Sequence, residues 1–314
     1  MPQADLRSTT KSTISGDIDQ PFSIRRQYRR EHRARNAAEN VQPFDVELSW
    51  PPSGNRLAER LGRLESIGTP SRMLCDLFWL DLDWRAIERR LGPLVVHDLG
   101  GGSGRYVRRL RAAAAPVKLR IHVFDVASRP AWASLADQDT TFRTFDGRDF
   151  AATLSDGPNL LISQSTLEHV REDLAYFDAV AAYAARGRKL LQIHMLPGAT
   201  GLPQYDLHGW RHYTRDNFRA IAATLPEGST MSVIGLGDLR HVALHCKYFP
   251  NGRIKLPSPN KGFRRAAYMR TFETLLSDPA PATVADAAFL CLVIESNLGA
   301  PLATSLTRSQ QAAL

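Results

Sequence analysis

Cysteine is scarce in this sequence. The 314 residues include only three, Cys75, Cys246 and Cys291, and they are far apart along the chain. This spacing excludes a disulfide framework and a zinc site built on closely spaced cysteine pairs, and we expect no metal site from the sequence. Unpaired cysteines in small number are typical of a reducing compartment.

Long apolar runs are also missing. No stretch approaches the roughly 20 consecutive apolar residues that a membrane-spanning helix needs, and residues 1–20 lack the apolar segment of a signal peptide. Hydrophobic residues make up 43% of the chain and charged residues 23%, which is ordinary for a soluble globular protein. We therefore expect a cytoplasmic protein.

Acidic residues are outnumbered by basic ones. There are 32 Asp and Glu against 40 Lys and Arg, and the resulting net charge of +8 favours an anionic partner. The excess is concentrated in two segments, since residues 25–35 contain six arginines and residues 247–270 contain seven Lys or Arg without an Asp or Glu. Two interpretations stay open for each segment. One is a solvated basic surface, and the other is a surface for phosphate, as in RNA, a nucleotide-sugar or a lipid-linked diphosphate.

The pattern along the chain predicts three parts. We expect residues 1–45 to be a basic, partly disordered arm, residues 46–93 a helical cap, and residues 94–314 the main domain with a basic insertion at about 241–284. In the main domain, short apolar runs alternate with helical patterns, which predicts an α/β fold with a mostly parallel sheet covered on both faces. The runs that predict its seven strands are 94–99, 119–126, 140–147, 159–165, 189–196, 231–236 and 287–296.

The cap is predicted to contain a long helical segment. Residues 71–92 have helical periodicity, and Gly92 followed by Pro93 ends the segment directly before the first strand. Its aromatic residues, Phe78, Trp79 and Trp84, are expected in the core of a helical cap over the cleft of the main domain.

A dense glycine cluster follows the first predicted strand. Four glycines occupy five positions, Gly100, Gly101, Gly102 and Gly104. A glycine-rich turn between a strand and a helix lets backbone N–H groups approach a ligand closely. The dinucleotide fingerprint G-x-G-x-x-G/A does not fit, because its last position is Arg105 or Val107. Asp98, two residues before the glycines, suits an amino-acid cation better than a diphosphate.

The segment HDLGGGSG resembles the first motif of the class I S-adenosylmethionine-dependent methyltransferases, and the similarity extends over most of residues 70–240. It implies a Rossmann-like sheet with an antiparallel last strand, S-adenosylmethionine as cofactor and S-adenosylhomocysteine as product. By this resemblance Asp98 supports the methionine end, Asp125 binds both ribose hydroxyls, Asp146 meets the adenine amine and Ser163 lies beside the methionine portion. The implied cofactor-binding set is Asp98, Gly100, Gly101, Gly102, Gly104, Asp125, Val126, Asp146, Gly147 and Ser163.

Residues 76–105 are also similar to a bacterial branch of these enzymes that is associated with cell-surface polysaccharide synthesis. This similarity implies O-methylation of a sugar or another small polar acceptor, with phosphate in or near it. The segment 204–214, which contains YDLHGWRHYT, offers aromatic, imidazole and guanidinium groups that suit a ring-shaped polar acceptor. An ordinary structured loop is the other interpretation of this segment.

Methyl transfer to a hydroxyl needs a proton acceptor, and three histidines are candidates. His208 in the segment 204–214 is preferred, ahead of His194 at the end of the strand 189–196 and His169 in the sequence LEHV. Some relatives bind a divalent metal near His169 through E-x-x-E-H, but the first glutamate position is Ser165 here. His169 and His194 can equally be packing residues.

Three other functions stay open from the sequence. The two basic segments favour an RNA methyltransferase, although residues 160–165 lack the Asn-Pro-Pro-Tyr type of sequence used in adenine amino-group methylation, and no cysteine is placed as a nucleophile. A non-catalytic protein that binds S-adenosylmethionine or S-adenosylhomocysteine would show binding without turnover. A nicotinamide-dependent dehydrogenase is the weakest of the three alternatives, because the glycine spacing does not fit the dinucleotide fingerprint.

Overall fold

The computed structural model describes residues 46–50, 57–64, 67–201, 209–249, 262–278 and 284–299. The arginine-rich segment 25–35, His208 and residues 250–261 of the second basic segment lie outside the described residues. The predictions made for these parts of the chain therefore stay predictions.

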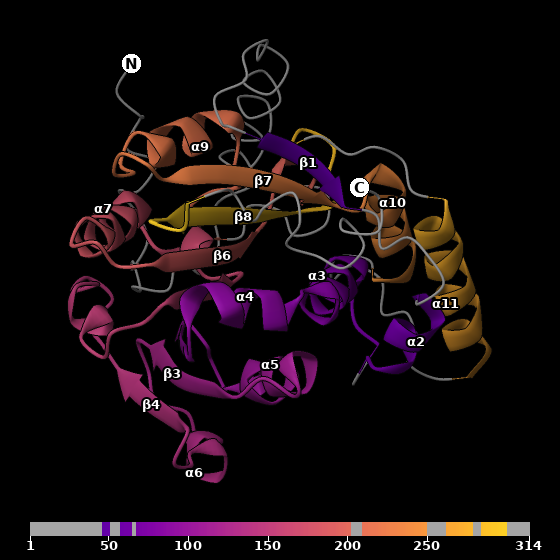
Figure 1. Cartoon of the computed structure of the whole chain (residues 1–314). Helices are drawn as coiled ribbons and strands as arrows, with labels where there is room; N and C mark the ends of the chain where they lie inside the picture. The colour runs from indigo at the N-terminus through magenta and orange to yellow at the C-terminus, as the bar shows by residue number, and fades with distance from the viewer. Residues whose placement is uncertain are drawn as a thin grey trace, which may run out of the picture.

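One eight-stranded sheet runs through the molecule in the order β1-β7-β8-β6-β5-β2-β3-β4 (Figure 1). Neighbouring strands are parallel, except that β8 is antiparallel to both β6 and β7. The strands are β1 (Val46–Trp50), β2 (Leu94–Leu99), β3 (Leu119–Asp125), β4 (Thr140–Thr144), β5 (Leu160–Gln164), β6 (Leu190–Leu196), β7 (Thr230–Leu236) and β8 (Phe289–Ser296). The predicted fold class is confirmed, with one strand more than the seven expected.

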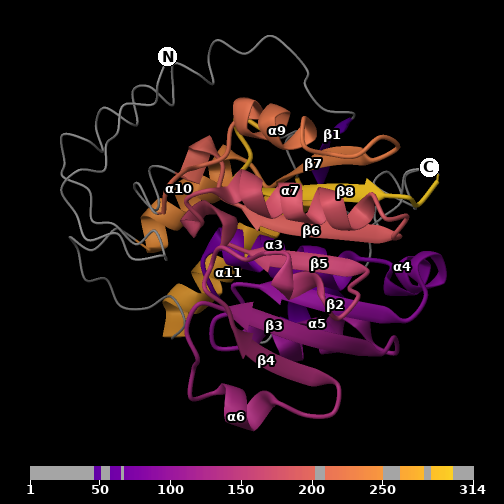
Figure 2. The same cartoon turned by 90° about the vertical axis from the view of Figure 1, so that its left-hand side faces the viewer.

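Helices cover both faces of this sheet. The first face packs against α3 (Pro70–Asp81), α4 (Trp84–Leu91), α5 (Arg105–Ala114), α10 (Leu239–Tyr248) and α11 (Gly262–Ser277). The second face, which is turned toward the viewer in Figure 2, packs against α7 (Asp173–Ala184) and α9 (Arg215–Ala222). Every residue of the central strands β6 and β8 is buried, which explains their continuous apolar sequences.

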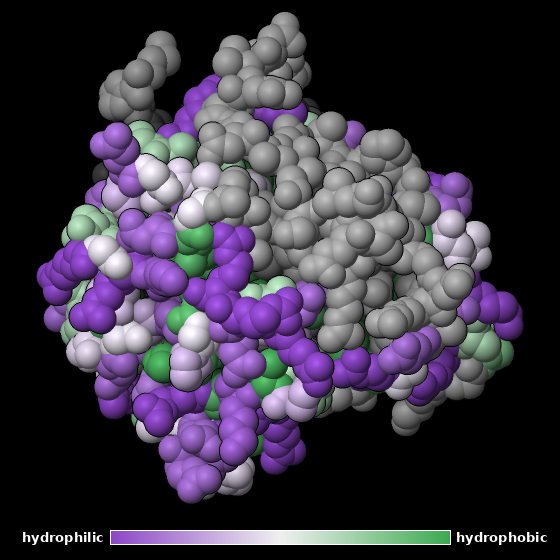
Figure 3. Space-filling view, in the orientation of Figure 1, coloured by the Kyte–Doolittle hydropathy of each residue, from purple (hydrophilic) through white to green (hydrophobic). Residues whose placement is uncertain are grey.

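Short elements complete the described chain. They are the helices α2 (Leu57–Gly62) and α6 (Trp132–Leu135) and the 3₁₀ turns η1 (Ala152–Leu154), η2 (Leu167–His169) and η3 (Ala199–Gly201). The described residues on the face in Figure 3 are mainly hydrophilic, with hydrophobic residues in small separate patches. No described helix is long and apolar enough to cross a membrane.

Two predictions for the cap are wrong in detail. Residues 46–50 form β1, which pairs in parallel with β7 at the edge of the sheet, although this segment was expected to be helical. The alternation of Val46, Leu48 and Trp50 with polar residues is the strand signal that the prediction passed over. The helical segment 71–92 is two helices, because α3 ends at Asp81 and Asp83 caps the start of α4 by accepting a hydrogen bond from the Ala86 N–H at 3.0 Å.

The basic insertion contains regular structure rather than a simple loop. Helices α10 and α11 pack against each other and α10 also packs against α3, so the first sheet face is extended by this part of the chain (Figure 1). Tyr268 and Phe272 of α11 are fully buried in the core of that face. The basic side chains of α11 thus belong to an element that is anchored in the fold.

The strand order places a crevice next to the glycine cluster. Strand β2 lies between β3 and β5, and the chain runs outward from it in opposite directions toward the two edges of the sheet. In such sheets ligands bind outside the carboxyl ends of the strands at this switch point. The ends of β2, β3 and β5 are therefore where a ligand site is expected.

Candidate functional site

The glycine turn joins the end of β2 to the start of α5 and is attached to β3. The Gly100 N–H donates to the Phe124 carbonyl at 2.7 Å, and the Trp132 indole N–H donates to the Gly102 carbonyl at 2.7 Å. Gly100, Gly102 and Gly104 have positive φ angles of 70°, 56° and 75°, a conformation that costs glycine little. The turn is thus fixed in shape by neighbouring elements.

The glycines differ in what surrounds them. A Cβ at Gly100 would overlap Thr166, and a Cβ at Gly101 would lie 2.7 Å from Asp98 Oδ2. A Cβ at Gly102 would meet no atom within 4 Å, so open space lies above this part of the turn. Gly104 instead packs closely against the Phe142 ring at the start of α5. The backbone around Gly102 is therefore the part of the turn that a ligand can approach.

Asp98 is buried beneath the turn. Its side chain is on the second-last residue of β2, it is 3% exposed, and its Oδ2 atom has no hydrogen-bond partner among the described residues. Burial, with a smaller contribution from the nearby Asp125 carboxylate, raises the pKa of Asp98 to about 7. A buried carboxyl without a partner is costly, and a cation delivered by a ligand would stabilise its charged form.

Asp125 ends β3 and faces the same turn. One carboxylate oxygen accepts a hydrogen bond from the Gly102 N–H at 2.9 Å, and the other accepts one from the Ala127 N–H at 3.2 Å. A carboxylate offers about four acceptor positions, so lone pairs remain for two further donors. The next side chain, Val126, is apolar and 39% exposed, which is unusual for a position at a strand end.

Asp146 and Gly147 follow β4 beside the end of β3, because the Phe145 N–H donates to the Asp125 carbonyl at 3.1 Å. Asp146 is exposed, and backbone N–H groups of Arg148 and Asp149 donate to its Oδ1 at 2.7 and 2.9 Å. These hydrogen bonds hold the pKa of Asp146 below its usual value. The expected adenine side of the site thus lies next to the expected ribose side.

Ser163 and His194 point away from this crevice. The Ser163 hydroxyl and His194 Nδ1 are 2.9 Å apart, His194 Nε2 is 3.2 Å from Gln192 Oε1, and both residues are fully buried. The His194 ring packs edge-on against Tyr176 of α7, within the second face of the sheet. Burial lowers the pKa of His194 to about 3. Strand alternation thus turns both side chains toward α7, and the expected places of Ser163 beside the cofactor and of His194 beside the reacting group stay predictions.

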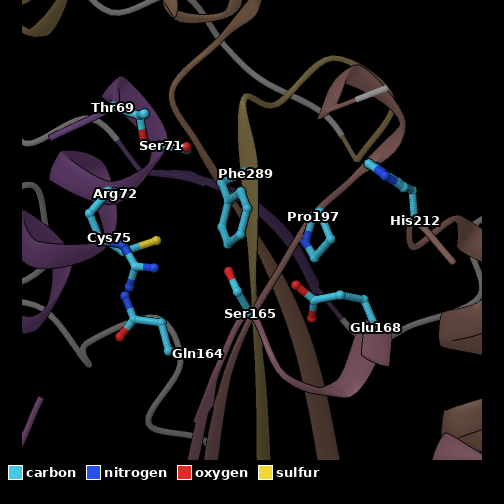
Figure 4. Close-up of a pocket in the computed structure, with 10 residues that line it drawn as sticks. All are labelled: Thr69, Ser71, Arg72, Cys75, Gln164, Ser165, Glu168, Pro197, His212 and Phe289. Carbon is cyan, nitrogen blue, oxygen red and sulfur yellow. Dashed lines mark hydrogen bonds between the residues drawn. The ribbon is translucent and has the colours of Figure 1, made fainter. Parts of the chain in front are cut away.

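A cavity of about 180 Å³ lies at the end of β5 (Figure 4). Thr166, which contacts Gly100 of the turn, directly follows the lining residue Ser165. The cavity is bounded by α3, by the residues after β5 and β6, and by the start of β8. The lining residues are Thr69, Ser71, Arg72, Cys75, Gln164, Ser165, Glu168, Pro197, His212 and Phe289. Burial raises the pKa of the Cys75 thiol, so this cysteine is not an activated nucleophile.

A hydrogen-bond network fixes the α3 wall of the cavity. The Tyr106 hydroxyl donates to Asp76 at 2.8 Å and accepts hydrogen bonds from Arg72 and from Gln164, both at 2.5 Å. The side-chain oxygen Oε1 of Gln164 accepts a further hydrogen bond from the Trp79 indole N–H at 3.1 Å. Arg72 and Gln164 are thereby held in one orientation at the cavity surface.

Glu168 places a carboxyl group in this cavity from η2 (Figure 4). It is 1% exposed, and its Oε2 atom has no hydrogen-bond partner among the described residues. Burial raises the pKa of Glu168 to about 8, although the charges of Arg72 and Arg211 act in the opposite direction. A carboxyl with this pKa is mostly protonated at neutral pH, and its deprotonated form is a stronger base than an ordinary carboxylate. From the sequence, Glu168 enters only through the E-x-x-E-H comparison near His169, although an acidic residue just after the fourth predicted strand was a signal for this position.

The remaining candidates lie around Glu168. His169 Nε2 is 3.9 Å from Glu168 Oε1, and the His169 side chain is partly exposed. The Trp210 N–H donates to the Glu168 carbonyl at 2.7 Å, so the described end of the segment 204–214 is bound to η2. His212 lines the cavity, and its Nδ1 is 3.0 Å from the Gly198 carbonyl oxygen.

Two residues of the segment 204–214 have structural partners instead of facing the cavity. Arg211 forms an ion pair with Asp173 at 2.9 Å, and the buried Tyr213 hydroxyl donates to the same carboxylate at 2.8 Å. These contacts join the segment to the start of α7. For Arg211 and Tyr213, these contacts favour the interpretation of the segment as an ordinary structured loop.

No protein-family model matches the chain, and no curated protein matches its sequence. Solved structures with similar folds include Haemonchus contortus phosphoethanolamine N-methyltransferase 2 in complex with S-adenosylmethionine, with 14% identity, a TM-score of 0.38 and coverage of 79% of this chain and 61% of that one. The chain thus spans about three fifths of that enzyme's length.

Two further structures belong to this comparison. The plantazolicin methyltransferase BamL in complex with S-adenosylhomocysteine has 11% identity and a TM-score of 0.41, and the match covers 73% of this chain and 85% of that one. An S-adenosylmethionine-dependent methyltransferase from Mesorhizobium loti has 13% identity and a TM-score of 0.39, over 68% and 95% of the two chains. Similarity at this level assigns no activity, so the function has to be argued from the residues of this chain.

Proposed function

We propose that this protein is an S-adenosylmethionine-dependent methyltransferase that acts on a hydroxyl of a sugar or another small polar acceptor. The observation that carries the proposal is the pair of carboxyl groups at the glycine turn. Asp98 lies under the turn with an unpartnered oxygen, and Asp125 faces it from the next strand. The two groups match the two ends of a ligand that has both a cationic amino acid and a ribose.

The residues present fit this cofactor. The unpartnered Asp98 oxygen suits the ammonium group of the methionine portion, and the open space above Gly102 admits the ligand against the backbone. The unused lone pairs of Asp125 suit two ribose hydroxyls, and the exposed apolar Val126 suits the adenine ring. When bound, this cofactor would supply a methyl group on a positively charged sulfur.

Glu168 supplies the acceptor side of the proposal. Methyl transfer from an activated carbon requires alignment of the acceptor, exclusion of water and removal of a proton from a hydroxyl. The Glu168 carboxyl faces the cavity, and its pKa of about 8 makes its deprotonated form a stronger base than an ordinary carboxylate. His208 remains a predicted base, and because it lies outside the described residues, experiment has to separate it from Glu168.

The size of the cavity favours a small acceptor. Its volume of about 180 Å³ is below the roughly 300–1,000 Å³ typical of pockets for drug-sized ligands. Its walls combine Arg72, Gln164 and Glu168 with the Phe289 ring, a mixture that suits a polar ring with an apolar face. Of the residues that gave the sugar interpretation from the sequence, Arg211 and Tyr213 are engaged with Asp173, whereas His212 lines the cavity.

An RNA methyltransferase is the second candidate, favoured by the basic side chains of α11 and of the segments outside the described residues. A non-catalytic protein that binds the same cofactor is the third. The RNA candidate requires a phosphate-binding surface along the chain 247–270, whereas the small-molecule candidate requires only the cavity.

The first test is methyl transfer from isotopically labelled S-adenosylmethionine into fractionated bacterial extract, with RNA, protein and glycan with its lipid-linked precursors kept separate. Calorimetric titrations with S-adenosylhomocysteine and with NAD⁺ accompany it. In the titrations we expect S-adenosylhomocysteine to bind and NAD⁺ not to bind. In the transfer experiment we expect the label in the glycan or small-molecule fraction. Label in nuclease-sensitive material would support the RNA candidate, and binding without label in any fraction would support the non-catalytic one. Absence of binding would contradict the whole proposal.

A further inference from the structure

A second cluster of ligand-type side chains lies on the opposite face of the sheet from Asp98. His97 on β2, His122 on β3 and Asp156 in the turn before β5 place one possible ligand atom each within 4.8 Å of the others. The two histidines are direct neighbours in the β2–β3 register. His97 and Asp98 are consecutive in the strand, so their side chains point to opposite faces and the two sites are separate.

His97 is a buried imidazole whose ring approaches the Thr153 backbone without a well-formed hydrogen bond. It is 3% exposed, and neither ring nitrogen has a partner among the described residues. Leaving a buried donor or acceptor unpaired costs about 1–3 kcal/mol, so a ligand that occupies one nitrogen would stabilise the fold. An imidazole nitrogen that carries no proton has a lone pair, which is the form that binds metals.

His122 is oriented by a neighbouring hydroxyl. Its Nδ1 is 2.7 Å from Thr141 Oγ1, and Thr141 is its direct neighbour in the β3–β4 register. If Nδ1 carries the proton and donates it to this hydroxyl, the Nε2 lone pair remains for a ligand. A hydrogen bond from the second ring nitrogen is the arrangement that fixes the tautomer and orientation of histidines at metal sites.

The two rings have a spacing that suits a shared ion. Their centroids are 5.2 Å apart, and the ring planes are inclined by 75°. With Zn–N distances of about 2.0–2.1 Å and tetrahedral angles, two imidazoles on one ion place their centroids about 5 Å apart. The separation therefore needs little adjustment, although an edge-on contact between two neutral rings has a similar spacing.

Asp156 completes the cluster from the exposed side. Its Oδ2 accepts a hydrogen bond from the Arg143 guanidinium at 2.6 Å, which leaves the second carboxylate oxygen for a cation. Arg143 repels a divalent ion, but it also holds the carboxylate in place in the way that outer hydrogen bonds orient metal ligands. The charged groups that face the histidines are Asp156 and Arg143, with Arg120 acting on His122.

We propose that His97, His122 and Asp156 bind one divalent transition-metal ion, with Zn²⁺ as the preferred ion and solvent in the fourth position. Two imidazoles and one carboxylate are a ligand set that Zn²⁺ accepts with tetrahedral geometry. The ion would connect the turn before β5 to β2 and β3, the strands that carry Asp98 and Asp125. It would stabilise the fold without taking part in methyl transfer, so this inference does not depend on the proposed function. It also revises the expectation from the sequence, which considered cysteine spacing and E-x-x-E-H but not histidines on adjacent strands.

The test uses the full chain without an affinity tag, freed of metal with a chelator and titrated with Zn²⁺ in competition with a chromophoric chelator. We expect one equivalent to bind and the melting temperature to rise with the Zn²⁺ concentration, because the ion binds only the folded state. The variants His97→Asn and His122→Gln should lower Zn²⁺ affinity at least about 100-fold, and Asp156→Asn about 10-fold or more. Cobalt substitution should give the visible spectrum of a tetrahedral site in the parent chain and not in His97→Asn.

Two controls make the result decisive. His245→Gln removes a buried histidine of α10 that is not part of the cluster, and it should leave Zn²⁺ affinity within about 2-fold. Asp156 is exposed, so Asp156→Asn remains informative if the histidine variants fail to fold. Less than 0.2 equivalents of Zn²⁺ on the parent chain, or equal affinity in Asp156→Asn and the parent, would overturn the proposal.

Discussion

The two sides of the candidate site are built in different ways. The donor side, which consists of the glycine turn with Asp98 and Asp125, is a continuous strand–turn–helix–strand unit whose contacts are mostly to the backbone. The acceptor side is the cavity around Glu168, and its residues come from separate parts of the chain between Thr69 and Phe289. Its side chains are held by bonds to other side chains, such as those to the Tyr106 hydroxyl. Changes on the donor side should therefore alter cofactor affinity, and changes on the acceptor side should alter turnover.

The largest effect is expected from Asp125→Ala on the donor side. The change removes the proposed partner of two ribose hydroxyls and the acceptor of the Gly102 N–H. Hydrogen bonds to charged groups contribute about 1.5–3 kcal/mol each, so S-adenosylhomocysteine affinity should fall by about 100-fold or more in calorimetric titration. Asp137→Ala, which removes an exposed aspartate on a neighbouring loop, is the matched control and should leave the affinity unchanged. Near-normal affinity in Asp125→Ala would contradict the proposal that Asp125 binds the ribose hydroxyls.

The acceptor side is tested by Glu168→Gln. This change keeps the shape of the side chain but removes its capacity to accept a proton, so kcat should fall by about 100-fold or more, while S-adenosylhomocysteine affinity stays within about 3-fold. In the parent enzyme kcat should rise with pH and level off above about 8, because Glu168 must be deprotonated to act as a base.

His169→Gln and His208→Ala separate Glu168 from the predicted histidine bases. His169 is the adjacent, partly exposed residue, and its change should affect kcat by less than about 5-fold if Glu168 is the base. If His208→Ala abolishes turnover while Glu168→Gln retains it, the base belongs to the segment 204–214, as the sequence predicts.

The difference between the two sides also explains what the sequence could predict. The glycine turn, the succession of strands and helices, and the position of Asp125 follow from local periodicity and from a motif of consecutive residues. Nothing local links Arg72 to Gln164 or Glu168, since their place in one cavity depends on how α3 docks on the sheet. The direction of the Ser163 and His194 side chains could not be predicted for a similar reason. In a strand that is buried on both faces, the apolar sequence does not indicate which side chains point to which face.

A smaller, pH-dependent effect is expected at Asp98. The group has a pKa of about 7 without ligand and must be ionised to pair with an ammonium group, so S-adenosylhomocysteine affinity should rise about 10-fold between pH 6 and pH 8. Asp98→Asn should bind more weakly at pH 8 and lose this dependence, whereas Glu168→Gln should keep it. A slope that persists in Asp98→Asn would show that another group titrates.

The same ionisation affects the stability of the ligand-free protein. Because the pKa of Asp98 is higher in the folded than in the unfolded state, the folded chain binds more protons between about pH 4 and pH 7. The contribution of Asp98 to the free energy of unfolding is therefore greatest at low pH and declines as pH rises through 7. Chemical denaturation of the parent and of Asp98→Asn across this range should show a flatter pH dependence in the variant.

The smallest effect on activity is expected from His194→Gln, although the sequence placed this histidine among the candidate bases. His194 is fully buried between Ser163 and Gln192, so its loss leaves buried polar groups unsatisfied and should lower the free energy of unfolding by about 1–3 kcal/mol. The folded fraction should retain kcat within about 3-fold. Ser163→Ala should give the same profile, and the double variant should be less destabilised than the sum of the two, because the two side chains share one contact. A 100-fold loss of kcat in correctly folded His194→Gln, with cofactor affinity intact, would support His194 as the general base. It would also mean that α7 moves away from this side chain during turnover.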